Sequence, residues 1–303
     1  MFLLLGTQLA LATGLTYTDT DCPLGDGKVR QYHKVSANTL GGYDSDLATY
    51  STRGQFREFA VSTCPDNYFS ALGTKLGDPV PDDKKGAVIK AIDASRATWM
   101  DSDRPEVWER YDTAARIAEA LGRDNLSVAE LYIMASWTAR DRAVGVYVGG
   151  LDGPQAAKEI LDIGATELGK SLTPEAEKVL RYNLARVAHR GGFMSDRDAH
   201  LDAYLSLTTL SGDERAAGER LKTIARVVEP ALQRKAIAAL KAALASAGSE
   251  ALLVRARYQL ADLQRRVGET AAAKRDFHLV VQSTAAPDDV RQLAKYLLGT
   301  LGG

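Results

Sequence analysis

The sequence is poor in the residues that most catalytic and metal sites need. It has two cysteines, four histidines and three tryptophans in 303 residues. No Cys-x-x-Cys, His-Glu-x-x-His or Gly-x-Ser-x-Gly pattern occurs, and no glycine-rich phosphate loop follows an apolar strand. We therefore expect a non-enzymatic protein with no catalytic residues, no cofactor and no metal ion. The histidines, which are scattered along the chain, are His33, His189, His200 and His278.

The chain also lacks a charge excess and a long apolar run. Lys and Arg number 38 against 39 Asp and Glu, a formal net charge of −1. Nucleic-acid-binding chains usually carry a basic surplus, so we expect no nucleic-acid partner. No apolar run reaches the roughly 18 residues of a membrane-spanning helix, so we expect no membrane span in the mature chain. Hydrophobic residues make up 45% of the chain, which is ample for a folded core.

The first 12 residues are typical of a secretory signal peptide. Residues 2–12 read FLLLGTQLALA, and Ala10 and Ala12 fit the small-x-small cleavage pattern. We predict cleavage after Ala12. The run is short and no Lys or Arg precedes it, so a buried N-terminal strand or helix is the alternative. Export would place the mature protein in the periplasm or at the cell surface, and without export it would be cytoplasmic.

Residues 105–303 are predicted to be almost entirely helical. Apolar residues recur there at intervals of three and four, and glycines such as Gly192 and Gly268 separate the periodic segments. Ser127 and Thr173 are candidate N-caps, because their hydroxyls can accept a hydrogen bond from the first helical turn. The expected helices span residues 105–121, 126–145, 154–169, 174–190, 196–209, 213–227, 230–246, 250–267, 270–283 and 287–299.

One helical pattern occurs twice in this part. Residues 181–192 read RYNLARVAHRGG, and residues 257–268 read RYQLADLQRRVG. The second copy and the helix after it resemble a tetratricopeptide repeat, a helical hairpin with small and large residues at fixed packing positions. The resemblance implies an array of stacked hairpins, each of which needs neighbours to bury its apolar face. The residues that carry it are Leu260, Ala261, Gly268, Ala273 and Phe277.

The resemblance also implies where a protein or peptide partner would bind. In tetratricopeptide arrays the first helix of each hairpin tends to line a concave face, which offers an extended binding surface. Arg and His side chains on that face could hold an acidic peptide or a chain terminus through charge-assisted hydrogen bonds. A solvated helix face with surface ion pairs is the alternative. The predicted contact residues are Tyr182, Arg186, His189, Arg190, Arg255, Tyr258, Asp262, Arg265 and Arg266.

Residues 16–76 are predicted to form a small β-rich head. Residues 29–35 and 55–62 alternate apolar and polar side chains, as half-buried strands do. Residues 77–104 read as a linker with one helix inside it, because a Pro-rich and Asp-rich start precedes apolar residues at helical spacing. The helical repeat domain then follows from residue 105.

Both cysteines lie in similar local sequences. Cys22 begins the sequence CPLG and Cys64 begins CPDN. The doubled Cys-Pro resembles the two knuckles of a zinc ribbon, in which four thiolates hold the ion. Gly25 and Asn67 stand where the second cysteine of each knuckle would be. This departure implies that a Cys22–Cys64 disulfide replaces the metal in an exported protein. Two free thiols, or a residual metal site with His33 as a third ligand, are the alternatives.

The whole arrangement resembles an uncharacterised bacterial family of unknown function, in which a cysteine-knuckle head precedes tetratricopeptide-like helices. Residues 131–142, LYIMASWTARDR, carry a matching signature. The resemblance covers most of residues 18–298 and implies a mainly α fold with a ribbon-like head, but no activity. We therefore expect a non-catalytic protein-interaction scaffold that acts outside the bacterial cytoplasm. A cytoplasmic regulatory or assembly factor with a vestigial zinc-ribbon head is the alternative.

Overall fold

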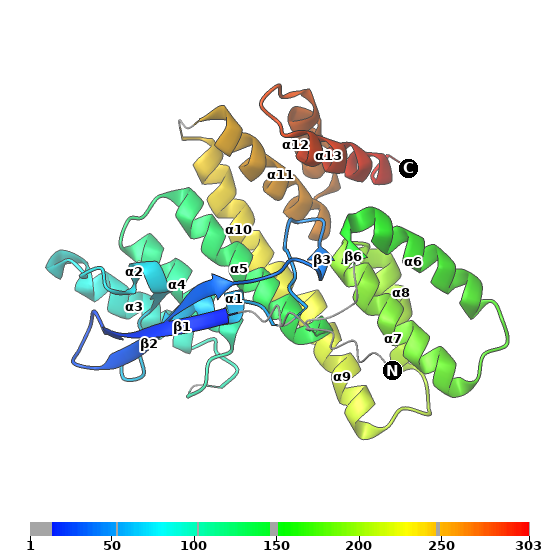
Figure 1. Ribbon diagram of the computed structural model, residues 1–303, viewed down its shortest axis with the longest axis horizontal. Helices are drawn as coiled ribbons and strands as arrows, with labels where there is room; N and C mark the ends of the chain where they lie inside the picture. Colours follow the sequence, from blue (N-terminus) through cyan, green and yellow to red (C-terminus); the bar gives the residue numbers. More distant parts are fainter. Residues whose placement is uncertain (1–13, 53, 102, 146–150, 247–248, 303) are drawn as a thin grey trace, which may run out of the picture.

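The structure, a computed structural model, is mainly α-helical with a small N-terminal β region, which confirms the predicted fold class (Figure 1). It describes residues 14–52, 54–101, 103–145, 151–246 and 249–302. The predicted signal peptide, residues 1–12, lies outside the described residues. No helix in the described ranges is long and apolar enough to cross a membrane.

The head contains two short β-hairpins. Strand β1 (Gly14–Asp21) pairs antiparallel with β2 (Lys28–Ser36), and β4 (Val61–Thr63) pairs antiparallel with β5 (Ser70–Leu72). The strand predicted over residues 29–35 is confirmed by β2.

The strand predicted over residues 55–62 is wrong in its first half. That half leads into the short helix α1 (Arg57–Ala60), and only the end of the predicted strand belongs to β4. The helical turn aims the Arg57 side chain at Asp141, with nitrogen–oxygen distances of 2.5 and 2.7 Å. The Tyr111 hydroxyl also donates to the Arg57 carbonyl at 2.8 Å. A tertiary ion pair therefore overrides the local alternation of apolar and polar residues.

Each Cys-Pro sequence forms the turn of one hairpin, and a disulfide joins the two turns. The Cys22 amide donates to the Gly27 carbonyl at 2.8 Å, and the Cys64 amide donates to the Phe69 carbonyl at 2.9 Å. The two cysteines are bonded, with their Cα atoms 5.9 Å apart, which confirms the predicted pairing. The side-chain amide of Asn67 donates to a carbonyl in the other turn, so it also ties the two turns together.

The head does not fit a zinc site. The sulfur atoms are bonded to each other, whereas a zinc ligand must be a free thiolate. The Nε2 atom of His33 lies 3.0 Å from the Thr18 hydroxyl on the neighbouring strand. No group of three or more His, Cys, Asp or Glu side chains that could hold a metal occurs in the part of the chain that the structure describes.

We expect the double substitution Cys22→Ser and Cys64→Ser to lower the free energy of unfolding by about 3–4 kcal/mol. The bond joins residues 42 positions apart, so its loss frees a large loop in the unfolded chain. Urea denaturation with and without reductant measures the effect. Reductant should shift the midpoint of the native chain but not that of the double variant, and equal midpoints for both oxidised proteins would contradict the prediction.

The helices pack as successive hairpins, but not in chain order (Figure 1). After the short α2 (Gly73–Leu76) and a 3-10 turn (Asp82–Lys84), three helices stack on one another. The third of these, α5, packs next on α10 rather than on α6. The helices of this main array are α3 (Lys85–Arg96), α4 (Val107–Ala120), α5 (Asn125–Val144), α10 (Glu229–Leu244), α11 (Glu250–Arg266), α12 (Thr270–Gln282) and α13 (Asp288–Thr300).

The helices between α5 and α10 form a side branch. Helix α6 packs on α7, α7 on α8 and α8 on α9, and a π-helical segment (Ile224–Val228) leads from α9 into α10. The two copies of the repeated sequence therefore lie in different branches, one in α7 and one in α11. The helices of the side branch are α6 (Gly153–Leu168), α7 (Pro174–Gly191), α8 (Met194–Leu205) and α9 (Gly212–Thr223).

Each helix expected from residue 105 onward is present, with small shifts at its ends. Thr173 caps α7 as predicted, since its hydroxyl accepts from the Ala176 amide at 3.2 Å. The cap predicted at Ser127 is wrong. Helix α5 starts nearly one turn earlier, and the Asp124 carboxylate accepts from the Ser127 amide at 2.9 Å.

A loop of the head enters the space between the main array and the side branch. We call residues 41–50 the acidic loop. Its ends are joined by a hydrogen bond of 2.9 Å from the Gly41 amide to the Tyr50 carbonyl, and its tip turns at Leu47, whose φ is 69°. Figure 1 shows strand β3 of this loop between α11 and the side branch.

Strand β3 (Gly42–Tyr43) pairs in parallel with β6 (Leu151–Asp152), which directly precedes α6. Gly42 has a φ of +79°, and a Cβ atom there would lie 2.0 Å from the Leu151 carbonyl oxygen. Only glycine fits so close to another backbone, and this contact fixes the point at which the acidic loop crosses the side branch.

Candidate functional site

The tip of the acidic loop is buried among arginines of the helices. Asp44, Ser45 and Asp46 are 0%, 0% and 1% exposed. Asp44 accepts from Arg140 of α5 and from Arg190 of α7, each at 2.7 Å. Asp46 accepts from both terminal nitrogens of Arg140, at 3.0 and 2.5 Å. The loop thus joins a helix of the main array to a helix of the side branch through charged hydrogen bonds.

Ser45 connects the loop to α11. Its hydroxyl oxygen lies 2.9 Å from Nη2 of Arg265 and 2.6 Å from Nη2 of Arg266, and its hydrogen is donated to Asp262 at 2.9 Å. The Tyr258 hydroxyl donates to the Ser45 carbonyl at 2.5 Å. The hydroxyl and the carbonyl of this serine are therefore satisfied by one face of α11.

A buried carboxylate and imidazole complete the cluster. Oε1 of Glu229 on α10 accepts from Arg140 at 2.6 Å, and its Oε2 lies 2.7 Å from Nε2 of His189. Burial alone would raise the pKa of Glu229, but Arg140 and His189 lower it to about 2. Burial also lowers the pKa of His189, and the charge of Glu229 offsets this only in part.

The cluster balances its charges. Burial opposes the ionised form of Asp46, but Arg140 and Arg266 hold the pKa of that carboxyl well below its usual range. Each ion is in contact with at least one of opposite sign, which is the condition for burying charges. With the neighbouring Arg57–Asp141 pair included, the carboxylates are Asp44, Asp46, Asp141, Glu229 and Asp262, and the guanidinium groups are Arg57, Arg140, Arg190, Arg265 and Arg266.

The same arginines of α11 cap the C-terminal end of α7. Arg265 donates to the carbonyl of Gly192 at 2.5 Å, and Arg266 donates to those of His189 and Arg190 at 3.1 and 2.8 Å. The last carbonyls of a helix have no partner within it and favour positive charge. The C-terminal ends of the two copies of the repeated sequence are thus in contact, although one copy lies in the side branch and the other in the main array.

The structure brings together six of the nine predicted contact residues, around the chain's own acidic loop. His189, Arg190, Tyr258, Asp262, Arg265 and Arg266 are all 9% exposed or less. The centre of the predicted groove is therefore already filled by residues of the head.

The other three predicted contact residues lie outside this cluster. Tyr182 packs on the ring of Tyr204, with centroids 5.0 Å apart. Arg186 donates from Nε to the Val144 carbonyl at the end of α5, at 2.5 Å. Arg255 is exposed on α11 and makes no hydrogen bond or ion pair with the described residues.

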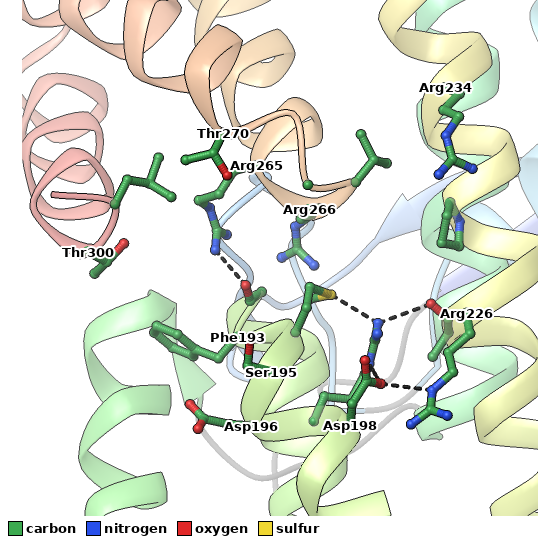
Figure 2. Close-up of a pocket in the computed structure, with 18 residues that line it drawn as sticks. Phe193, Ser195, Asp196, Asp198, Arg226, Arg234, Arg265, Arg266, Thr270 and Thr300 are labelled. Carbon is green, nitrogen blue, oxygen red and sulfur yellow. Dashed lines mark hydrogen bonds and ion pairs between the residues drawn. The ribbon is translucent and has the colours of Figure 1, made fainter. Parts of the chain in front are cut away.

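An open pocket borders the cluster between α8, α10 and the turn from α11 to α12. Its volume is about 600 Å³. Figure 2 shows Arg265 and Arg266 on one side of it and Arg226 and Arg234 on the other. Arg226 is held by Asp198 at 2.9 Å, whereas Arg234 is exposed and has no hydrogen bond or ion pair within the described residues. We call this space the arginine pocket.

Comparisons with known proteins give no match: no family model, no curated protein and no solved structure is similar to this chain.

Sequence reasoning missed the acidic loop and its partners Arg140 and Glu229. One signal for Arg140 was available, because residues 131–139, which precede it in the predicted helix, are mostly apolar on every side. A helix that is apolar all round is buried, so an arginine within it requires a buried acid. No comparable signal identifies Asp44 and Asp46, since Asp and Ser soon after a pair of glycines are typical of turns.

Proposed function

We propose that this protein is a non-catalytic protein-interaction scaffold that acts outside the bacterial cytoplasm and binds a partner protein or peptide on its helical array. One observation supports the proposal most. The space between the two branches already holds an acidic turn, the tip of the chain's own loop, through arginines of α5, α7 and α11. The chemistry of the helices therefore suits an acidic peptide, and helical arrays commonly bind partners on their concave faces.

The disulfide supports a location outside the cytoplasm. Disulfides persist in oxidising compartments and are rare in the cytoplasm, where thiols are kept reduced. Cys22 and Cys64 are 5% and 0% exposed, so the bond is shielded once the head has folded. The alternative function, a cytoplasmic regulatory or assembly factor, would need these two residues to remain thiols in the cell.

The intact mass of the protein from its native host separates the two compartments. We expect a mature chain that starts at Thr13 and whose two cysteines resist alkylation until a reductant is added. A chain that retains residues 1–12 and alkylates freely at both thiols would contradict export and favour the cytoplasmic role.

A photo-crosslinking residue placed on the array tests partner binding. Val227 follows the pocket-lining Arg226 in the chain and is 63% exposed, and Ile89 on α3 is 50% exposed and serves as the matched control. We expect a discrete crosslinked adduct in the host from position 227 and none from position 89. Equal labelling at both positions, or none at either, would argue against a partner-binding array.

A further inference from the structure

We infer that the arginine pocket is the site for an acidic peptide segment, with Arg234 as its principal free cation. This inference rests on the proposed function and names the chemistry of its partner. The pocket lies on the far side of the same Arg265 and Arg266 that hold the acidic loop, so one arginine pair separates the segment already bound from the space still open. A volume of about 600 Å³ is within the usual range for ligand sites.

The polar groups around the arginine pocket are mostly hydrogen-bond donors. Arg234 contributes a guanidinium group that no described residue engages. Arg226 is oriented by Asp198 and Asp202, each 2.9 Å away, so its position is fixed before a ligand arrives. A guanidinium group pairs with a carboxylate through two parallel hydrogen bonds, which makes carboxylates the ligands that arginines select best.

Two helix starts add to this excess of donors. Helices α8 and α12 begin at Met194 and Thr270, both on the pocket wall, and neither has a side-chain cap. The first three amides of a helix have no partner within it, and they favour negative charge. These amides add to the positive potential of the arginines, which remain the main cations of the pocket.

Of the two carboxylates on the pocket wall, Asp198 is paired with arginines and Asp196 is left to oppose an acidic ligand. Asp196 is in the first turn of α8, lines the pocket and has no ion pair with the described residues (Figure 2). Its carboxylate should repel the ligand and thereby limit its affinity. Asp196→Asn should therefore tighten binding, an effect that a purely structural role of this wall would not produce.

The acidic loop shows how such a segment is bound. Its Asp44-Ser45-Asp46 tip presents two carboxylates and a hydroxyl to four arginines, Arg140, Arg190, Arg265 and Arg266. A partner segment with acidic side chains at similar spacing could use Arg234 and Arg226 in the same way. Because the loop is buried, the partner would bind beside it and would not displace it.

The test measures binding of a synthetic peptide by the purified full-length chain. The probe is a fluorescent peptide of five aspartates, blocked at both ends, and the matched peptide carries five asparagines. Fluorescence anisotropy at low ionic strength gives the affinities, since salt screens exposed charges. Inorganic phosphate as a competitor shows whether the pocket prefers a peptide or a free anion.

The decisive variant is Arg234→Glu, with Arg255→Glu as its control. Both arginines are exposed and without partners among the described residues, and both substitutions change the net charge equally, but Arg255 lies outside the arginine pocket. We expect Arg234→Glu to weaken binding of the aspartate peptide by about tenfold or more, and Arg255→Glu by less than about twofold. Asp196→Asn should strengthen it several-fold.

Three outcomes would overturn the inference: no binding of the aspartate peptide, equal binding of the asparagine peptide, or equal losses in the two arginine variants. Displacement by phosphate at equal concentration would assign the pocket to a free anion instead. These results are independent of the cellular test. If a partner crosslinks in the host and Arg234→Glu does not weaken its binding, the proposed function stands but this site does not. If the peptide binds in vitro and no partner crosslinks in the host, the site stands but the proposed function does not.

Discussion

Replacing Arg140 by alanine should lower the free energy of unfolding by about 3–5 kcal/mol or more, a large share of the stability of an ordinary domain. Arg140 is fully buried and contacts Asp44, Asp46 and Glu229 at 2.7, 2.5 and 2.6 Å. Its loss leaves three buried carboxylates short of positive charge, and the cost of an unpaired buried charge far exceeds that of a lost surface contact. Urea denaturation followed by circular dichroism measures the loss.

Arg142 on the same helix is the control. Its side chain is 53% exposed and lies 3.5 Å from Glu106, so Arg142→Ala should change the stability by less than about 1 kcal/mol. Arg140→Lys should also be strongly destabilising, because one ammonium group cannot reach three carboxylates as the planar guanidinium does. Similar midpoints for Arg140→Ala and Arg142→Ala would show that the buried cluster does not hold the acidic loop in place.

The helices of this protein were predictable because their signal is local. The apolar periodicity, the glycines between helices and a cap such as Thr173 all lie within the helix or a few residues from its ends. The pairing of the cysteines was also correct, since the resemblance placed both in facing turns. The order in which the helices pack was not predictable, because α5 and α10 are separated by the side branch and no local pattern records their contact.

The candidate site shows the same division. The arginines and the histidine of the repeated sequence were identified, and the structure brings six of the nine predicted residues into one cluster. Their partner was missed because it comes from the head, where Asp44 and Asp46 look like ordinary turn residues. Pairing between Asp46 and Arg140 depends on a contact across 94 positions, which periodicity cannot detect. Long-range ion pairs of this kind decide the site, and a single sequence can indicate that a buried arginine needs an acid but not which acid it pairs with.

Acid should lower the stability of this protein in two stages. Glu229 has a pKa of about 2 in the folded protein against 4.5 for the free side chain, so the folded state binds fewer protons than the unfolded state in between. Its contribution, roughly 3 kcal/mol, is complete above about pH 4.5 and is lost as the pH falls toward 2. The pKa values of Asp46 and Asp262 are also lowered, so they add to the same stage.

The milder stage arises from histidine. The pKa of His189 is lowered by burial, with Arg197 and Arg140 nearby and Glu229 opposing, so the folded state favours the neutral ring. Stability that depends on the neutral ring is complete above about pH 6.5 and declines as the pH falls, by at most about 1.4 kcal/mol per pH unit. His200 has a lowered pKa for the same reason and should contribute in the same direction.

His189→Gln isolates this stage. Glutamine cannot take up the proton, so urea midpoints of the variant should fall less between about pH 6.5 and pH 5 than those of the native chain. The steep loss below about pH 4.5 should remain, because Glu229 and the aspartates still titrate. His278→Gln, at an exposed position on α12, is the control for the substitution itself. If His189→Gln kept the full decline, the buried imidazole would not be the group that couples this fold to mild acid.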